Sequence, residues 1–244
     1  MPSLMDIGKS AINAQRQALN VTGQNIANVN TEGYRRRDAD LKEVSGSQGD
    51  LASKSAQIGL GVTLGEVRRA FNSFLAQSHN SAESKFQTAS NFVESLERLE
   101  NIILPTEGDL ASQLTNFFLK LSDISANPGD LAPRAAAIET GSSLSHAFNM
   151  TSQLTLQLRQ QLRLAVDEEV SSLNRLTESL ALVNGKLRAS NIGSAPPLAL
   201  LDERDRLISA ISQKSLVNVE YGSRFEANLT LGRYAKGPKL ITGD

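Results

Sequence analysis

The sequence LMDIGKSAINAQRQALNVTGQNIANVNTEGY, from Leu4 to Tyr34, begins with an amphipathic pattern typical of a helix. Its apolar and small residues recur at alternating steps of three and four, as in a heptad repeat. The seam residues are Leu4, Ile7, Ala11, Ala14, Ala18, Val21, Asn25 and Asn28, and they are flanked by Ile12, Leu19 and Ile26. Small seam residues allow another helix to approach closely but bury little apolar area. We therefore expect this helix to need a partner helix along most of its length.

The polar residues that follow the seam predict the end of the helix. Asn and Thr side chains bond local backbone groups, and Gly33 is suited to turn the chain. The ring of Tyr34 can pack while its hydroxyl stays in water. An ordinary helix C-terminus is the simplest interpretation of these residues, because such stop signals are common.

The segment GQNIANVNTEGYRR, residues 23–36, also resembles the N-terminal signature of the flagellar axial proteins. That family includes rod proteins, hook proteins and the first hook-associated proteins, in which an apolar helix precedes an Ala-Asn-x-x-Thr-x-Gly-Tyr segment. The matching residues are Ala27, Asn28, Thr31, Gly33 and Tyr34. The resemblance implies an exported building block of a helical tube, in which these five residues form an assembly motif.

Composition limits the function classes. The chain has 244 residues, 40% of them hydrophobic, which is enough for one or two modest domains. A net charge of −1 argues against nucleic acid as the main partner, and we interpret Arg35 to Arg37 as a solvated loop. Because there is no cysteine, disulfides, thiolate nucleophiles and cysteine-bound zinc are excluded.

Hydropathy predicts neither membrane insertion nor a cleavable signal peptide. No apolar run approaches the roughly 20 residues needed to cross a bilayer. The first residues lack a basic segment followed by an apolar core, which is the mark of a signal peptide. The family resemblance implies export through the flagellar type III apparatus instead, which needs no such peptide.

Residues 35–70 are predicted to be a loop and extended linker. The polar stretch 45–49 is typical of a mobile loop, and residues 57–69 suggest short extended segments. Gly59, Gly61 and Gly65 do not have the spacing of a dinucleotide-binding loop, and no strand-helix-strand pattern surrounds them.

The next 143 residues, 71–213, are predicted to be a long-helix bundle domain. Helical patterns cover residues 71–104 and about 133–188, with possible interruptions at Gly141 or Gly185, and a short helix capped by Asp109 lies between them. A further helix is expected at 197–213. The expected fold class is mainly α: an elongated antiparallel helical bundle or coiled coil, with an extended N-terminal helix.

The segment LLDERDRL, residues 200–207, contains a cluster of charges. Asp202 and Arg206 have the spacing of a helical ion pair, and we interpret the cluster as a solvated charged face because no nucleophile or metal ligand set accompanies it. The pattern also resembles a segment of the hook-associated protein 1 family. The matching residues are Leu200, Leu201, Asp202, Arg204, Asp205 and Leu207. Rod and hook proteins lack the long helical middle, which favours the hook-associated protein 1 family.

The last residues, 214–244, change to the alternation of strands. Val217 to Tyr221 and Phe225 to Leu231 alternate around a Gly222-Ser223 turn, which predicts a small C-terminal hairpin. Because two strands and a fragment rarely stand alone, we expect the start of a larger β domain that is truncated here. The resemblance covers nearly all of this chain but about the first half of a typical family member.

No catalytic, cofactor or metal site is predicted. His79 and His146 are isolated, and no carboxylate or second histidine stands at ligand spacing from either. Asp167 to Glu169 are most simply a solvated helix face. We expect no cofactor and no enzymatic activity.

The resemblance implies a structural subunit at the junction between flagellar hook and filament, located outside the cell. The expected partners are copies of itself in a ring, hook protein, the second junction protein (hook-associated protein 3), the type III export apparatus and an export chaperone. The N-terminal residues, 1–34, would be the axial assembly helix. The alternatives are a rod-type or hook-type axial protein, and a helical adaptor or exported effector without a role in tube formation.

Overall fold

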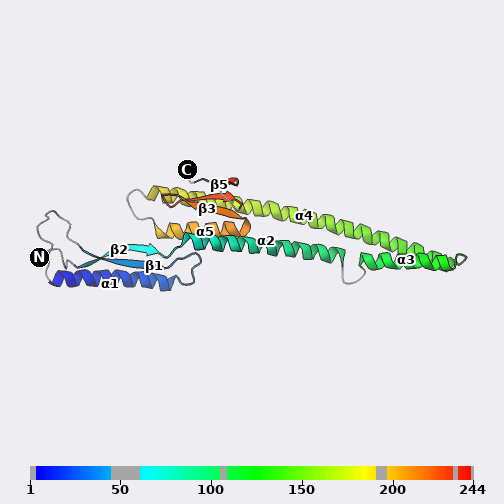
Figure 1. The fold of residues 1–244 in the computed structure, drawn as a ribbon, viewed down its shortest axis with the longest axis horizontal. Helices are drawn as coiled ribbons and strands as arrows, with labels where there is room; N and C mark the ends of the chain where they lie inside the picture. Colours follow the sequence, from blue (N-terminus) through cyan, green and yellow to red (C-terminus); the bar gives the residue numbers. More distant parts are fainter. Residues whose placement is uncertain (1–3, 45–60, 105–108, 191–196, 233–235, 243–244) are drawn as a thin grey trace. The chain divides into compact units, whose positions relative to one another are not determined.

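The computed structural model describes residues 4–44, 61–104, 109–190, 197–232 and 236–242. The fold is mainly α with small antiparallel sheets (Figure 1). The elements in order are α1 (Leu4–Ala27), β1 (Arg37–Glu43), β2 (Val62–Arg69), α2 (Ser73–Ile103), α3 (Leu110–Ala126), α4 (Leu131–Ser190), α5 (Leu198–Lys214), β3 (Val217–Tyr221), β4 (Ala227–Leu231) and β5 (Lys239–Ile241). The chain divides into two compact units, of which the first combines residues 1–82 with 176–244 and the second contains 83–175.

In the first unit, α1 packs against a ribbon formed by β1 and β2 (Figure 1). The strands are antiparallel, pair Arg37 with Arg69 at one end and Glu43 with Val62 at the other, and have a bulge after Asp40. Residues 35–70 are therefore not simply a linker. The expected mobile loop at 45–49 and Gly59 lie outside the described residues.

The ribbon covers the seam of α1. Ala14 and Val21 are buried, and Ile7, Ala11, Ala18 and Asn25 are partly covered, whereas Leu4 is exposed. Within the described residues the seam thus contacts the two strands of the ribbon, at the place where we expected a partner helix. On the outer side of the helix, Met5, Ile12, Leu19 and Ile26 follow one another at intervals of seven residues and are 63–70% exposed. We call these four residues the open stripe.

Ser10 and Gly61 fix the ribbon to α1. The Ser10 hydroxyl donates to the Ile7 carbonyl at 2.8 Å and accepts from the Val62 amide at 3.2 Å. Gly61 has a φ of +102°, and a Cβ at this position would lie 2.2 Å from Ser10 Oγ. A side chain here would therefore push the ribbon away from the helix.

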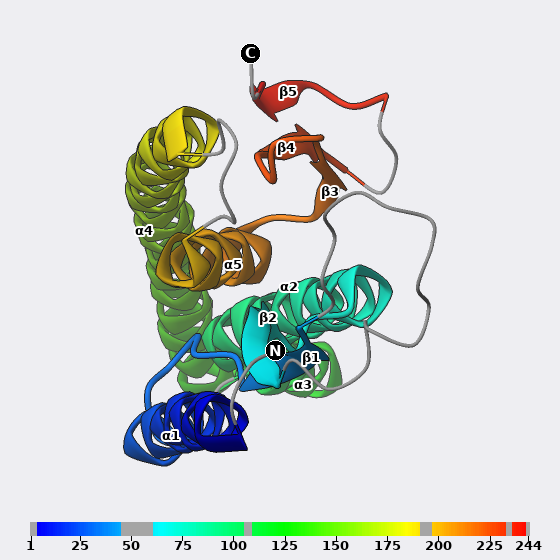
Figure 2. The same cartoon turned by 90° about the vertical axis from the view of Figure 1, so that its left-hand side faces the viewer.

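The apolar core of the first unit lies between the end of α4, α5 and the three-stranded sheet β3-β4-β5 (Figure 2). The predicted hairpin is confirmed, with Val217 opposite Leu231 and Tyr221 opposite Ala227. The fully buried side chains of this core include Leu180, Leu187, Ile208, Ile211 and Leu229. A polar contact joins helix to sheet, because the Asn184 amide donates to the Ala227 carbonyl at 2.8 Å and accepts from the Ala227 amide at 3.0 Å.

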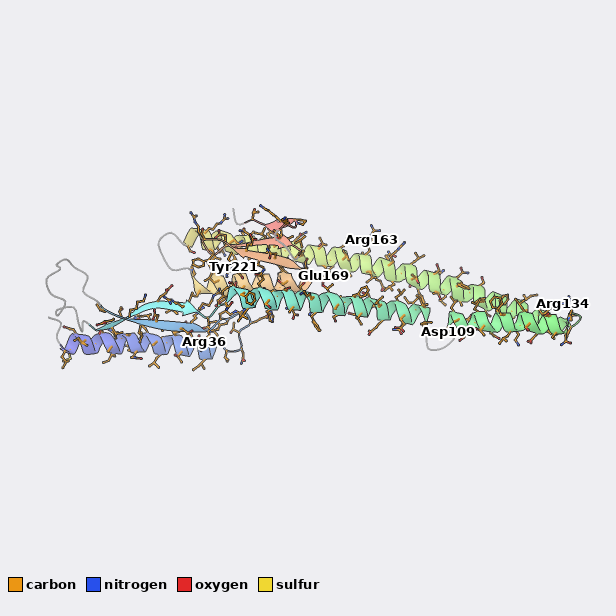
Figure 3. All side chains as sticks on the ribbon, viewed as in Figure 1. Arg36, Asp109, Arg134, Arg163, Glu169 and Tyr221 are labelled. Atoms are coloured by element: carbon orange, nitrogen blue, oxygen red, sulfur yellow. The ribbon has the colours of Figure 1, made fainter. Side chains whose placement is uncertain are left out.

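The second unit contains most of α2, all of α3 and the first part of α4. The predicted cap of α3 is confirmed: Asp109, labelled at the start of α3 in Figure 3, accepts from the Ser112 amide at 3.0 Å. The 60 residues of α4, about 90 Å at 1.5 Å per residue, run through Gly141 and Gly185 without a break. Gly141 allows the ring of Phe117 to pack close to the helix, 3.1 Å from where a Cβ would lie.

Replacing Asn184 with alanine should lower the free energy of unfolding by about 2–4 kcal/mol, because two backbone groups of Ala227 lose their buried partner. Urea unfolding followed by circular dichroism measures the loss. The exposed Asn174 on the same helix provides the matched control, since Asn174→Ala should change stability little. Equal effects of the two substitutions would contradict this account of the core.

Candidate assembly site

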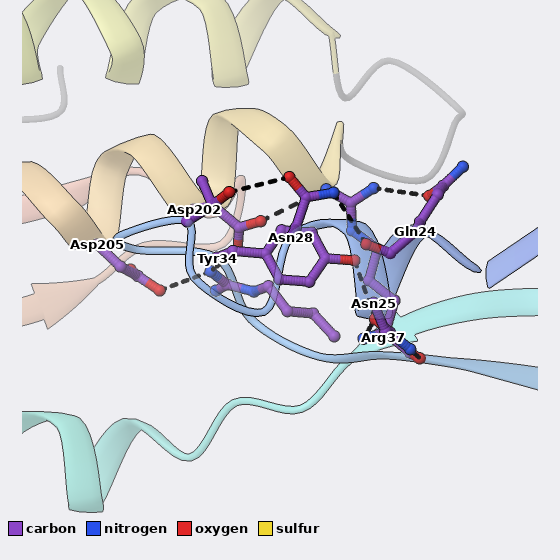
Figure 4. Close-up of polar contacts among 9 residues, drawn as sticks. Gln24, Asn25, Asn28, Tyr34, Arg37, Asp202 and Asp205 are labelled. Atoms are coloured by element: carbon purple, nitrogen blue, oxygen red, sulfur yellow. Dashed lines mark hydrogen bonds and ion pairs between the residues drawn. The ribbon is translucent and has the colours of Figure 1, made fainter. Parts of the chain in front are cut away.

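The end of α1 is held by the side chain of Asn25. Its amide oxygen accepts from the Arg37 backbone amide and from the Tyr34 hydroxyl, each at 2.9 Å, and its amide nitrogen donates to the Arg37 carbonyl at 2.8 Å. Nearby, the Thr31 hydroxyl donates to the Asn28 side-chain oxygen at 3.2 Å. These bonds close the turn that leads from the helix into β1 (Figure 4).

Gly33 places this turn against α5. Its φ is +80°, and a Cβ here would lie 3.1 Å from the Cβ of Arg206. The motif Ala27 to Tyr34 and the segment Leu200 to Leu207, which the sequence singled out separately, therefore meet in space (Figure 4). A shallow groove of about 420 Å³ is lined by residues of both, including Thr31, Gly33 and Asp202.

Behind the turn lies a buried cluster of opposite charges, which we call the Arg–Asp cluster: Arg37, Arg69, Asp202, Arg204 and Asp205. Arg37 and Arg69 each donate to Asp202, at 3.5 and 3.2 Å. Arg69 also donates to Asp205 at 2.6 Å, and Arg204 donates to the other oxygen of Asp205 at 2.7 Å. The cluster thus joins the β1–β2 ribbon to α5 through ion pairs that are largely shielded from water.

Aromatic rings cover one side of this cluster. The guanidinium of Arg69 lies 4.5 Å from the Phe71 ring centre, and that of Arg204 lies 4.5 Å from the Tyr221 ring centre. The two rings meet edge to face at 5.8 Å. Burial, with a further contribution from Asp205, raises the pKa of the Tyr221 phenol above its ordinary value, and the nearby arginines act in the opposite direction.

Two interpretations of the charged segments were wrong. The expected pair of Asp202 with Arg206 is absent, because Arg206 pairs with Glu203 at 2.6 Å while Asp202 pairs with the arginines of the ribbon. The face with Asp202, Arg204 and Asp205 is buried and not solvated, and Arg37 shares in it. One signal was present: Arg204 falls on the same helical face as Leu201, Leu207, Ile208 and Ile211.

The remaining motif residues have different surroundings. Ala27 and Thr31 are exposed, whereas Asn28 and Tyr34 are partly covered. Leu201 and Leu207 are buried in the core, and Leu200 is partly exposed. Within the described residues, no three His, Cys, Asp or Glu side chains are grouped so as to hold a metal ion. None of the described helices is both long and apolar enough to cross a membrane.

Residues 96–244 match the family model of the flagellar hook-associated protein FlgK helical domain. The chain belongs to the FlgK family. Residues 5–35, which contain α1 and the assembly motif, match the model of the flagella basal body rod protein family. The FlgK family is a family of structural flagellar proteins and not of enzymes.

Curated relatives agree with this assignment. Flagellar hook-associated protein 1 of Escherichia coli (strain K12) is 27% identical over the whole chain, and that of Bacillus subtilis (strain 168) is 26% identical over 89% of it. The chain corresponds to their N-terminal part and spans 44% of the length of each. The flagellar hook junction protein FlgK from Burkholderia pseudomallei shares the fold, with a TM-score of 0.61 and 24% identity, over 68% of this chain and 29% of that one.

Gly33→Ala should destabilise the first unit by about 1–3 kcal/mol, because alanine is strained at a positive φ and its Cβ would press on Arg206. Chemical unfolding measures the change. Gly23→Ala is the matched control, since this helical position has free space and alanine should stabilise it by about 0.5–1 kcal/mol. A neutral or stabilising effect of Gly33→Ala would show that the turn does not rest on α5.

Tyr221 should make stability fall at alkaline pH. Both states carry the neutral phenol below the unfolded pKa, about 10, but above it the unfolded chain loses this proton first, because the folded pKa is raised. The contribution of Tyr221 is thus present below the unfolded pKa and lost as the pH rises through the folded pKa. In Tyr221→Phe, which keeps the ring, unfolding measured from neutral to alkaline pH should show a smaller decline. If the stability of the two proteins declined equally with pH, the proposed contribution of Tyr221 would be contradicted.

Proposed function

We propose that this chain is the N-terminal part of a structural subunit that joins the flagellar hook to the filament, and that it assembles by helix packing along the open stripe. One observation carries the proposal: α1 is covered on one side by its own ribbon, while Met5, Ile12, Leu19 and Ile26 remain exposed on the other. Membership of the FlgK family and the rod-protein match over α1 support it.

The open stripe has the geometry of a helix-pairing surface. Residues at intervals of seven form a line along one side of a helix, as at one core position of a coiled coil. Burying one large aliphatic side chain contributes about 1.5–3 kcal/mol, so four in a row provide a substantial driving force for a second helix. The seam residues pack against the ribbon, and the open stripe would pack against a helix in the assembly.

The partner helix would come from the C-terminal part of the same subunit or from α1 of a neighbouring subunit. Around the ring, copies of the chain would contact one another, hook protein would lie on one side and hook-associated protein 3 on the other. The motif Ala27 to Tyr34 would form the turn that leaves the inner tube. Delivery to this site outside the cell would need the type III export apparatus and an export chaperone.

The test replaces Ile12 and Leu19 with serine in the chromosomal gene. The expected result is loss of swimming, with hooks that carry no filaments in electron micrographs, because the stripe no longer holds a second helix. The purified variant should keep the unfolding curve of the parent, since both residues are exposed in the isolated chain.

Asn13→Ser with Asn20→Ser is the control, because these exposed residues also lie seven apart on α1, each one position after a stripe residue. These cells should swim normally. Filaments of normal number and length on cells with Ile12→Ser and Leu19→Ser would overturn the assignment of the open stripe.

A further inference from the structure

We propose that the Arg–Asp cluster is a positioning device that fixes the orientation of α1, and with it the open stripe, relative to α5. The inference rests on the proposed function, since it concerns how the assembling helix is presented. Arg37 and Arg69 are the positioning residues, and Asp202 and Asp205 are their anchors on α5.

The first step is the geometry of the ribbon. Arg37 and Arg69 are directly opposite each other in the β1–β2 register, at the end of the ribbon nearest to the turn. Side chains opposite each other across two strands lie on the same face of the sheet. The ribbon therefore ends in two guanidinium groups that lie next to each other.

The second step is the matching geometry of α5. Asp202 and Asp205 are three residues apart, so their carboxylates lie on one face of the helix. One oxygen of Asp202 accepts from Arg37 and the other from Arg69, so that this carboxylate lies between two like charges. Arginines placed opposite each other in a ribbon repel. Asp202 compensates both of them, and Asp205 additionally accepts from Arg69.

The third step is the direction of the contact. Apolar surfaces attract without a preferred orientation, whereas hydrogen-bonded ion pairs shielded from water hold one arrangement. Buried ion pairs often add little to net stability compared with apolar groups of similar size, and in some proteins they select one geometry. With Gly33 resting on Arg206 nearby, the ribbon and α1 are fixed to α5 at two adjacent places.

A distance measurement tests this on the full chain. The protein contains no cysteine, so spin labels can be attached to cysteines introduced at Gln17 on α1 and Gln213 on α5, which are both exposed. Double electron–electron resonance should give one narrow distance distribution for the parent. Asp202→Asn, which keeps the shape but removes the compensating charge, should widen it by about twofold or more.

Glu203→Gln is the matched control, because it removes a neighbouring carboxylate whose partner, Arg206, lies on the same helix. Its distribution should stay as narrow as that of the parent. Equal widening in Glu203→Gln and Asp202→Asn would overturn the inference.

A second variant separates positioning from stability. Arg37→Met with Asp202→Leu replaces the Arg37–Asp202 ion pair by apolar side chains and also removes the Asp202 contact of Arg69, which keeps its pair with Asp205. The chain should therefore melt close to the parent temperature but still give a wide distribution. A narrow distribution in this folded variant would overturn the inference, even if Asp202→Asn fails to fold.

In cells, Asp202→Asn should reduce the number of hooks that carry filaments, whereas Glu203→Gln should not. Normal filaments in the Asp202→Asn strain would refute a role of the cluster in assembly. The proposed function would remain standing in that case, because it is tested separately by the variants of the open stripe.

Discussion

The ion pairs of Arg37 and Arg69 with Asp202 and Asp205 are the contact that joins the β1–β2 ribbon to α5. Two guanidinium groups meet at the end of a two-stranded ribbon, where they would repel each other without a carboxylate between them. Because the ribbon also covers the seam of α1, the two carboxylates Asp202 and Asp205 connect the N-terminal helix to α5 through the ribbon.

The two surfaces of α1 follow from this arrangement. Its small seam residues allow the ribbon to approach closely, and Ser10 and Gly61 fix the contact at one end while Asn25 fixes it at the other. The larger residues of the open stripe are left on the outer side, where the chain itself provides no cover within the described residues. A helix with one side satisfied and one side open is suited to pair with another helix.

The two family models match separate segments of the chain and leave the segment between them unmatched. The rod-protein model ends at residue 35 and the FlgK helical-domain model begins at residue 96, so neither covers the β1–β2 ribbon. The ribbon nevertheless carries Arg37 and Arg69, whose ion pairs with α5 join the segment that matches the rod-protein family to the segment that matches the FlgK helical domain. These ion pairs explain why the motif Ala27 to Tyr34 lies against the segment Leu200 to Leu207.

The long helices, the cap at Asp109, the C-terminal hairpin and the family could be predicted from the sequence, because these depend on local periodicity, turn chemistry and contiguous motifs. The cover of the α1 seam and the buried charges could not be predicted, because they depend on contacts between distant segments. The strand β1, RDADLKE, is too polar to be recognised alone, and its partner β2 follows after an intervening segment of 18 residues. Asp202 appeared to be a solvated helical residue because its partners, Arg37 and Arg69, lie 165 and 133 positions away. Ion pairs between residues so far apart leave no periodic signal in a sequence, so only the folded chain reveals them.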